Sequence, residues 1–315
     1  MSDLATTVPL ALAQLAVLLA LAPGLSGFIK TAKARVQGRT GPPLVQPYAD
    51  LFKLLRKDLV VSDHTSWVFS WAPAIYAGAL ATAALLVPLL WMPAPLSGWG
   101  DAITFVGLLA LARFALALAA LDTGSAFGGM GASREVAVAA LAEPALLLGL
   151  FAVALRTGGT DLGAMSAWVA AHGSAAIAPG QILAGLALAV AVIAETGRVP
   201  VDNPDTHLEL TMIHEGMLLE YSGRALGILT WATHLKQLML FALLIALFAP
   251  TGIATSPEQL PVALAGLALK LVVLGTAVAV FESVNSKLRI LKLPEFIGTA
   301  SALATLALIT ELVLP

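Results

Sequence analysis

The sequence predicts an all-α integral membrane protein with about eight transmembrane helices, an amphipathic interfacial helix and a helix in an acidic loop. Apolar residues make up 59 % of the chain and charged residues only 11 %, whereas a soluble domain carries about 25 % charged residues. Eight apolar runs are long enough to cross about 30 Å of hydrocarbon. Lysine and arginine gather in alternate connections between these runs. We expect residues 1–315 to form a single helical membrane domain.

The first apolar run, 8–28, is predicted to be a transmembrane helix rather than a signal peptide. It has no basic start, because Asp3 is the only charged residue before Lys30, and no A-x-A-like site leads into a soluble domain. Each of the other seven predicted spans is bounded by proline, glycine or charge. They cover 70–91, 102–121, 136–155, 180–197, 227–249, 260–283 and 294–313.

The lysine and arginine positions predict the orientation of the bundle. The first, third, fifth and seventh connections carry thirteen of the seventeen Lys and Arg residues, whereas the second, fourth and sixth carry Arg156 alone. Basic connections stay in the cytoplasm. We therefore expect a multi-pass protein of a prokaryotic cytoplasmic membrane, with both termini outside and the acidic loop inside. The net charge of −2 gives no reason to expect nucleic-acid binding.

Three segments outside the spans have helical patterns. In 43–59 apolar residues recur at helical spacing and basic residues lie mostly on the remaining face, which predicts an interfacial amphipathic helix. Tyr48 and Lys53 are its candidates for gripping a partner. A second helix is predicted between Asp205 and Tyr221, with Asn203 or Asp205 as its N-cap. On the outer side, 161–171 is expected to form a short surface helix.

The stretch ETGRVPVDNPDTHLELTMIHEGMLLEYSGR, residues 195–224, holds six of the nineteen acidic residues and two of the five histidines. Such groups are costly to keep in a membrane protein, so the cluster predicts a functional site. Positions eleven apart on a helix are nearly eclipsed, which places Glu209 and Glu220 on one face and Glu215 elsewhere. His207 and His214 share a neighbouring face. Carboxylates and imidazoles placed in this way could pass protons.

The alternative interpretation of this stretch is a solvated acidic loop or a surface that docks a partner. Arg198, Asp205 and Glu215 are the candidate docking residues. The apolar residues between 208 and 219 leave the predicted helix little solvated surface, and the two interpretations stay open on the residues alone.

Glu143 lies well inside the fourth predicted span, one residue before Pro144. A carboxylate at that depth is expected to be protonated or hydrogen-bonded, which fits either proton relay or a structural bond to a neighbouring helix. Glu135 is interpreted as the first-turn acid of the same helix.

Four further ionisable residues inside the spans need partners: Arg113, Lys236, Lys270 and Glu282. Arg113 could pair with Glu143 or with Asp122. For each of the four, a structural ion pair and ion conduction are both open. The chain has no cysteine, which excludes a cysteine-ligated zinc or iron–sulfur site on this chain alone. The spacing of His207 and His214 does not suit a helical zinc site either.

Three segments carry a family resemblance. The stretch 195–224 resembles a loop of the proton-channel subunit of respiratory complex I, with which it shares the E-T-x-R-x-P-x-D opening and the EYSG close. GRTGPPLVQPYADLFKLLRKD, residues 38–58, and LDTGSAFGGMGASRE, residues 121–135, are closer to the homologous subunit of energy-converting nickel–iron hydrogenases. These are the formate hydrogenlyase, hydrogenase-4 and CO-linked types.

The resemblance implies a membrane subunit that links electron transfer in a soluble arm to translocation of protons or Na⁺. It implies no cofactor on this chain, and a nickel–iron centre and iron–sulfur clusters on partner subunits. Those partners are the hydrogenase large and small subunits, an iron–sulfur subunit and antiporter-like membrane subunits. By resemblance Glu143 is the buried carboxylate of the proton pathway, Glu195 and Arg198 match the start of the loop, and Asp202, Glu209 and Glu220 match its acidic positions.

Two departures favour the hydrogenase branch over quinone chemistry. Val201 stands where the complex I pattern has phenylalanine, and the segment from Asp202 to Glu220 is longer than in that pattern. The alternatives are a quinone-reducing complex I subunit and a purely structural membrane anchor.

Overall fold

The computed structural model describes residues 4–92, 94–203, 212–254 and 256–313, and within them the chain is helical, without a β-strand. The α-helices are α1 (Leu4–Val36), α2 (Gln46–Leu55), α3 (Trp67–Leu86), α4 (Ala102–Asp122), α5 (Ala126–Thr157), α6 (Leu162–His172), α7 (Pro179–Glu195), α8 (His214–Leu218), α9 (Gly223–Phe248), α10 (Leu260–Val284) and α11 (Leu293–Val313). Three 3₁₀ turns accompany them: η1 (Gly173–Ala176), η2 (Pro257–Gln259) and η3 (Ile290–Lys292).

Among the described residues, seven helices are long and apolar enough to cross a membrane: α1, α3, α4, α5, α9, α10 and α11. The eighth predicted span is α7, an apolar helix of 17 residues. The all-α membrane fold predicted from the sequence is therefore confirmed. The amphipathic segment 43–59 contains the helix α2, and the segment 161–171 forms the helix α6, as predicted.

The start of α5 differs from the prediction, which began the span at 136. The helix begins at Ala126 and includes the sequence FGGMG, which the prediction left outside the span. A Cβ atom at Gly131 would lie only 3.0 Å from the backbone of Gly216, Ile213 and Met217. A side chain at position 131 would obstruct this approach, so glycine here lets α8 pack directly against α5.

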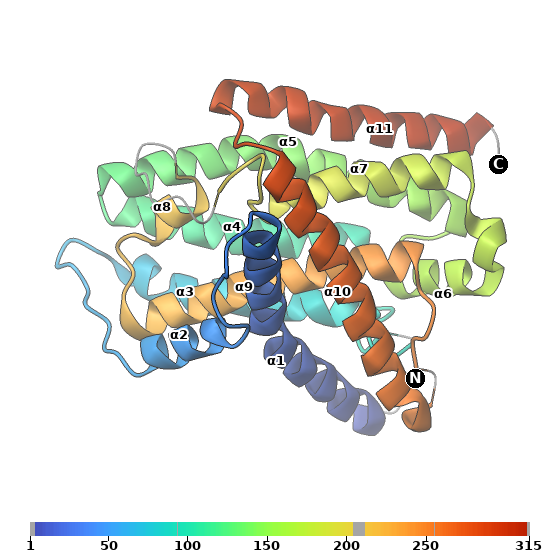
Figure 1. Cartoon of the computed structure of the whole chain (residues 1–315), viewed down its shortest axis with the longest axis horizontal. Helices are drawn as coiled ribbons and strands as arrows, with labels where there is room; N and C mark the ends of the chain where they lie inside the picture. Colours follow the sequence, from blue (N-terminus) through green and yellow to red (C-terminus); the bar gives the residue numbers. More distant parts are fainter. Residues whose placement is uncertain (1–3, 93, 204–211, 255, 314–315) are drawn as a thin grey trace.

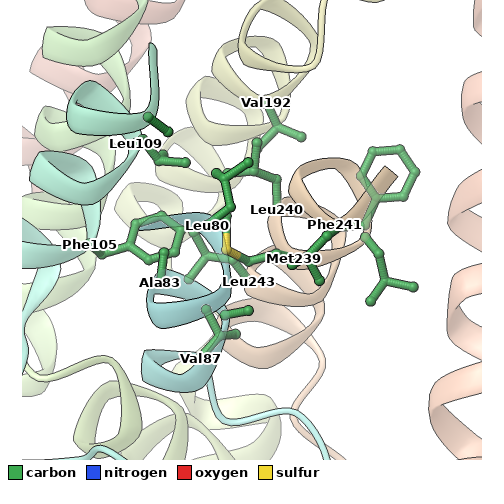
Figure 2. Close-up of a cluster of buried hydrophobic side chains, with 14 of the residues drawn as sticks. Leu80, Ala83, Val87, Phe105, Leu109, Val192, Met239, Leu240, Phe241 and Leu243 are labelled. Carbon is green, nitrogen blue, oxygen red and sulfur yellow. The ribbon is translucent and has the colours of Figure 1, made fainter. Parts of the chain in front are cut away.

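The helix α9 is the centre of the bundle and the most buried of the candidate spans. It contacts α1, α2, α3, α6, α7 and α10, and Figure 1 shows it running between the α5–α7–α11 layer and the α1–α3 side. Figure 2 shows a core in which Leu80 of α3, Phe105 of α4, Val192 of α7 and Phe241 of α9 gather. Between helices in lipid, such side chains stabilise the bundle through van der Waals packing rather than through removal of apolar surface from water.

Side chains from other elements donate to the carbonyls four residues before Pro23 and Pro73, which lie inside α1 and α3, and before Pro88, which follows the end of α3. A proline has no N–H, so the carbonyl four residues earlier loses its helical donor. In each case a side chain distant in sequence donates instead. The three bonds are Trp231 Nε1 to the Leu19 carbonyl (2.9 Å), Tyr221 Oη to the Phe69 carbonyl (2.8 Å) and Gln14 Nε2 to the Ala84 carbonyl (3.2 Å).

The amphipathic helix α2 lies against the kinked part of α1. Tyr48 donates its hydroxyl to the Ala20 carbonyl at 2.5 Å, and a Cβ atom at Gly27 would lie 2.4 Å from the Leu44 carbonyl oxygen. The Tyr48 hydroxyl therefore bonds within the chain, whereas the Lys53 side chain is exposed. Figure 1 places α2 and α8 toward one end of the bundle, and α6 and the last turn of α11 toward the other.

The acidic loop is described only in part. Asp205, His207 and Glu209 lie outside the described residues, as does the proposed N-cap at Asp205. The described remainder forms α8, a helix of five residues. Val201 is buried with Ile213 and Leu293 in a small apolar cluster where the loop covers the α5, α7 and α11 ends.

Candidate functional site

Arg113, in the middle of α4, contacts three carboxylates. Its Nη2 lies 2.5 Å from Glu195 Oε2 at the end of α7, and its Nη1 donates to Glu143 of α5. Its Nε lies 3.5 Å from Glu135 Oε1, also on α5. The planar guanidinium suits this task because its donors point in several fixed directions. One buried cation therefore holds α4, α5 and α7 together at membrane depth.

Glu195 is shared between two cations. The Lys236 ammonium of α9 lies 3.1 Å from Glu195 Oε2, the oxygen that also contacts Arg113. The Glu195 side chain is fully buried, and its Oε1 has no hydrogen-bond partner within the described residues. A buried polar atom without a partner is costly, so this oxygen is poised to accept a further donor, including a proton.

A second network adjoins the first through α9. Gln237, next to Lys236, accepts a hydrogen bond from Arg198 at 2.6 Å. Arg198 in turn lies 3.4 Å from Glu282 of α10, and Lys33 of α1 contacts the same carboxylate at 3.2 Å. Polar and charged residues thus connect the central helix α9 to five others: α1, α4, α5, α7 and α10.

A small polar cavity of about 60 Å³ opens beside these networks. Its lining residues are Tyr76, Glu135, Glu195, Thr196, Gly197, Asp202, His214, Glu215, Thr233 and Lys236. The volume and the polar walls suit a few water molecules, which need two to four polar partners each. Carboxylates from α5, the α7 end and the acidic loop therefore face one polar space.

Asp202 fixes the loop at the edge of this cavity. Its Oδ1 lies 2.6 Å from the Lys287 ammonium, and its Oδ2 accepts the backbone N–H groups of Ile213 and His214 at 3.3 and 3.4 Å. The His214 ring contacts Thr233 Oγ1 at 3.1 Å. The carboxylate therefore ties the start of α8 to the segment that follows α10.

Several predicted residues come together and others do not. Glu143, Glu195, Asp202, His214 and Lys236 belong to the networks or the cavity wall. Glu220 is exposed, whereas Glu215 lines the cavity. Helical phasing had predicted that Glu220 shares a face with Glu209 and that Glu215 points elsewhere. It fails because the described part of the loop is helical over only five residues, from His214 to Leu218, so phase is not carried along the stretch.

Three other expectations differ from the structure. Arg198, a candidate docking residue, is buried in its contact with Glu282. Lys270, expected in an ion pair, donates instead to the Ala249 carbonyl at 2.6 Å and to the Thr251 carbonyl. Basic side chains near a helix C-terminus satisfy the free carbonyls there. Asp122, the other partner considered for Arg113, accepts the backbone N–H groups that begin α3.

Sequence reasoning missed two carboxylates. Glu135 was assigned to a first helical turn, but α5 begins at Ala126, so its side chain lies within the helix and reaches Arg113. Glu311, near the end of α11, lies 3.0 Å from Arg156 and received no role. The signal for this pair was available, because Arg156 is the only basic residue in the even-numbered connections. Within the described residues no group of three or more His, Cys, Asp or Glu side chains could hold a metal ion.

Comparison with known proteins agrees with this architecture. The family model described as NADH dehydrogenase matches residues 8–313. Formate hydrogenlyase subunit 4 of Escherichia coli (strain K12) is 37 % identical over 303 residues, covering 96 % of this chain and 97 % of that protein. Hydrogenase-4 component C of the same organism is 38 % identical over 242 residues, covering 77 % of this chain and 75 % of that protein.

Complex I subunits are more distant. A subunit of the NADH-quinone oxidoreductase of Syntrophotalea carbinolica is 29 % identical over 271 residues, covering 79 % of each chain. A chain of the membrane-bound sulfane sulfur reductase, an archaeal respiratory membrane complex, superposes with a TM-score of 0.86 over 97 % of this chain and 99 % of that one. At 21 % identity this match shows the fold alone. The resemblance seen in the three sequence segments is thus confirmed, and the chain belongs to the NADH dehydrogenase family of membrane subunits.

Proposed function

We propose that this chain is the membrane-anchoring and coupling subunit of an energy-converting hydrogenase complex. It would link electron transfer in a soluble arm to translocation of protons or Na⁺. The observation that carries the proposal is the set of charged groups that runs from the buried Asp202 across the small cavity to the buried Glu195 and Arg113, and from Arg113 to the partly exposed Glu143. Buried ionisable groups at membrane depth are a functional-site hypothesis by default. The relatives from formate hydrogenlyase and hydrogenase-4 support the hydrogenase assignment over the quinone-reducing one.

The proposed coupling works through exchange of partners. Glu195 divides between Arg113 and Lys236, and Arg113 divides among three carboxylates. Protonating one carboxylate removes its charge and frees the cation for another. A change of charge in the cavity beside Asp202 would therefore shift the pairing at Glu195 and then at Glu143. Glu209, Glu220 and His207 of the acidic loop are proposed to feed this route from the loop side, with His214 at the cavity.

The proposed orientation places the α2–α8 end of the bundle in the cytoplasm and both termini outside, in a prokaryotic cytoplasmic membrane. The bias of lysine and arginine toward that end supports it. The soluble arm would dock there, close to the acidic loop and to the exposed Lys53. The proposed partners are the hydrogenase large and small subunits, an iron–sulfur subunit and antiporter-like membrane subunits. The nickel–iron centre and the iron–sulfur clusters would reside on the soluble partners.

The test is Glu143→Gln in the assembled complex. Glutamine keeps the size and a carbonyl acceptor for Arg113 but cannot ionise, so we expect normal assembly and hydrogenase activity with loss of ion pumping in reconstituted vesicles. Glu258→Gln, the same chemical change at an exposed carboxylate of η2, is the matched control and should pump normally. Full pumping by the Glu143 variant would contradict the proposal.

One observation favours a structural anchor as the second candidate. Among the described residues, Glu143, Glu195, Asp202 and Glu282 each contact a cation, which is also what a purely structural role requires. Under that interpretation, neutralising Asp202, Glu209 and Glu220 together would lower the yield of assembled complex and leave pumping per complex unchanged. A drop in pumping per assembled complex would exclude it.

A further inference from the structure

An open groove between α4 and α5 exposes part of the charged site on the side of the bundle. Its volume is about 510 Å³, and it is lined by Gly107, Ala110, Leu111, Arg113, Phe114, Val136, Ala139, Ala140 and Glu143. The Glu143 side chain is 26 % exposed here, near the middle of the 32-residue helix α5. A charged group at that depth should not face hydrocarbon, so the groove needs a cover.

The Ala140 carbonyl gives an independent reason to expect one. Pro144 lies inside α5 and removes the donor that this carbonyl would receive in an unbroken helix. The carbonyls four residues before Pro23 and Pro73, which also lie inside helices, each accept a side-chain donor from elsewhere in the chain, as does the carbonyl four residues before Pro88, which follows α3. No side chain in the described part of the chain donates to Ala140, whose residue lines the groove.

We infer that a membrane-spanning helix of a partner subunit occupies this groove and donates a side-chain hydrogen bond to the Ala140 carbonyl, next to Glu143. The donor would be an N–H or O–H group, as the indole, phenol and amide groups are at the other three proline sites. This inference rests on the proposed function only in requiring a membrane complex of several subunits. It does not require that Glu143 carry protons.

The small residues of the groove suit a helix. Gly107, Ala110, Ala139 and Ala140 leave room for a second backbone to approach closely, which is how helices associate within membranes. The polar groups already in the groove would then be covered by protein rather than by lipid. A helix also satisfies its own backbone hydrogen bonds in hydrocarbon, so only its side chain need be polar.

Two other occupants fit less well. A lipid tail has no hydrogen-bond donor, and phospholipid headgroups lie at the membrane surface rather than near the middle of α5. A second copy of this chain, packed symmetrically, would place Glu143 against Glu143 and one open carbonyl against another. Like charges at low dielectric repel strongly, and two acceptors cannot bond to each other.

Photocrosslinking in native membranes is the direct test. A photoreactive residue at Phe114, which is exposed in the groove, should form an adduct with a transmembrane segment of a different subunit. Mass spectrometry of the adduct would identify that segment, which should contain a donor side chain. An adduct with a second copy of this chain, or with lipid alone, would overturn the inference.

Two substitutions then test the helix and its donor. Ala140→Trp fills the groove and should release the crosslinked subunit from the purified complex, whereas Ala265→Trp, on the exposed face of α10, should not. Pro144→Ala returns a backbone donor to the Ala140 carbonyl. It should lower retention of that subunit roughly threefold to tenfold, as loss of one hydrogen bond predicts.

The outcomes separate this inference from the proposed function. Unchanged retention in both Ala140→Trp and Pro144→Ala would refute the docking helix, whatever Glu143→Gln does to pumping. Adducts at Phe114 and subunit loss in Ala140→Trp, combined with full pumping by Glu143→Gln, would support the docking helix and contradict the relay.

Discussion

The two halves of the bundle use charge in different ways. Toward α2 and α8, ionisable side chains form networks in which one cation serves several carboxylates, with Arg113 at the centre of one and Glu282 of the other. Toward α6 the described charged groups form isolated contacts, such as Arg156 with Glu311 and Lys270 with two carbonyls. Shared partners can be exchanged, whereas an isolated pair can only be made or broken.

The isolated Arg156–Glu311 pair has the features of a packing device. A Cβ atom at Gly180 would lie 2.4 Å from Glu311 Oε1, so the carboxyl group rests directly on the α7 backbone. The Arg156 guanidinium lies 5.8 Å from the centre of the Trp168 ring, within range of a cation–π contact. The pair thus joins the ends of α5 and α11 and the side of α6. We therefore predict that removing a charge in the half toward α2 and α8 disturbs several neighbouring contacts, whereas removing one in the half toward α6 disturbs only its own contact.

The largest effect is expected for Arg113→Met. It leaves Glu143, Glu195 and Glu135 without their shared cation, and removing one member of a buried charge cluster costs about 3–5 kcal/mol. We expect a large fall in the thermal stability and yield of the detergent-solubilised complex. Adding Glu143→Gln to this variant should restore part of the stability, because fewer charges are then unpaired. Equal yield of Arg113→Met and the unaltered protein would contradict the network.

Loss of charge in the Arg156–Glu311 pair should have a smaller and purely structural effect. Glu311→Gln keeps an acceptor for Arg156 but loses the charge, so we expect about 1–3 kcal/mol lower stability of the assembled complex. Ion pumping per assembled complex should be unchanged. In double-mutant cycles, Arg113 and Lys236 should be coupled through Glu195, whereas Glu311 and Lys270 should be additive. Coupling between Glu311 and Lys270 would contradict the distinction between the two halves of the bundle.

The sequence predicted the spans better than the site because the two depend on different information. The length of an apolar run is enough to predict α4 or α9, and the basic residues predict on which side of the membrane each connection lies. The contact between Arg113 and Glu195 joins residues on separate helices, and no periodicity within one helix encodes it. Glu135 was misassigned because the predicted span began only at 136, whereas α5 begins at Ala126 and continues through Gly131, where α8 packs on it. Glu215 was misplaced because helical phase was assumed through a segment whose described helix is short.

A still smaller effect is expected for Lys270→Met. The ammonium supplies donors to the Ala249 and Thr251 carbonyls just after α9, and loss of such a cap costs about 1 kcal/mol. Methionine keeps the apolar stem, so packing against α9 should persist. The complex should melt at a slightly lower temperature and pump at the normal rate. A pumping defect would mean that charge in the half of the bundle toward α6 takes part in the coupling.

The smallest effect should come from Asp101, the N-cap of α4, and it should depend on pH. Asp101 accepts the Thr104 N–H at 2.9 Å, and this backbone hydrogen bond holds the pKa of the carboxyl below its usual value. The charged form therefore stabilises the folded state above the unfolded pKa of about 4, and this contribution is lost as pH falls through the lower folded value. Asp101→Asn keeps an acceptor for Thr104 but does not titrate, so its melting temperature should change less between about pH 5 and pH 3 than that of the unaltered protein. Because Asp101 contacts no described cation through an ion pair, the pH dependence of stability in the two proteins should differ by the binding of only one proton. A difference of several protons would indicate that the half of the bundle toward α6, like the half toward α2 and α8, shares its charges.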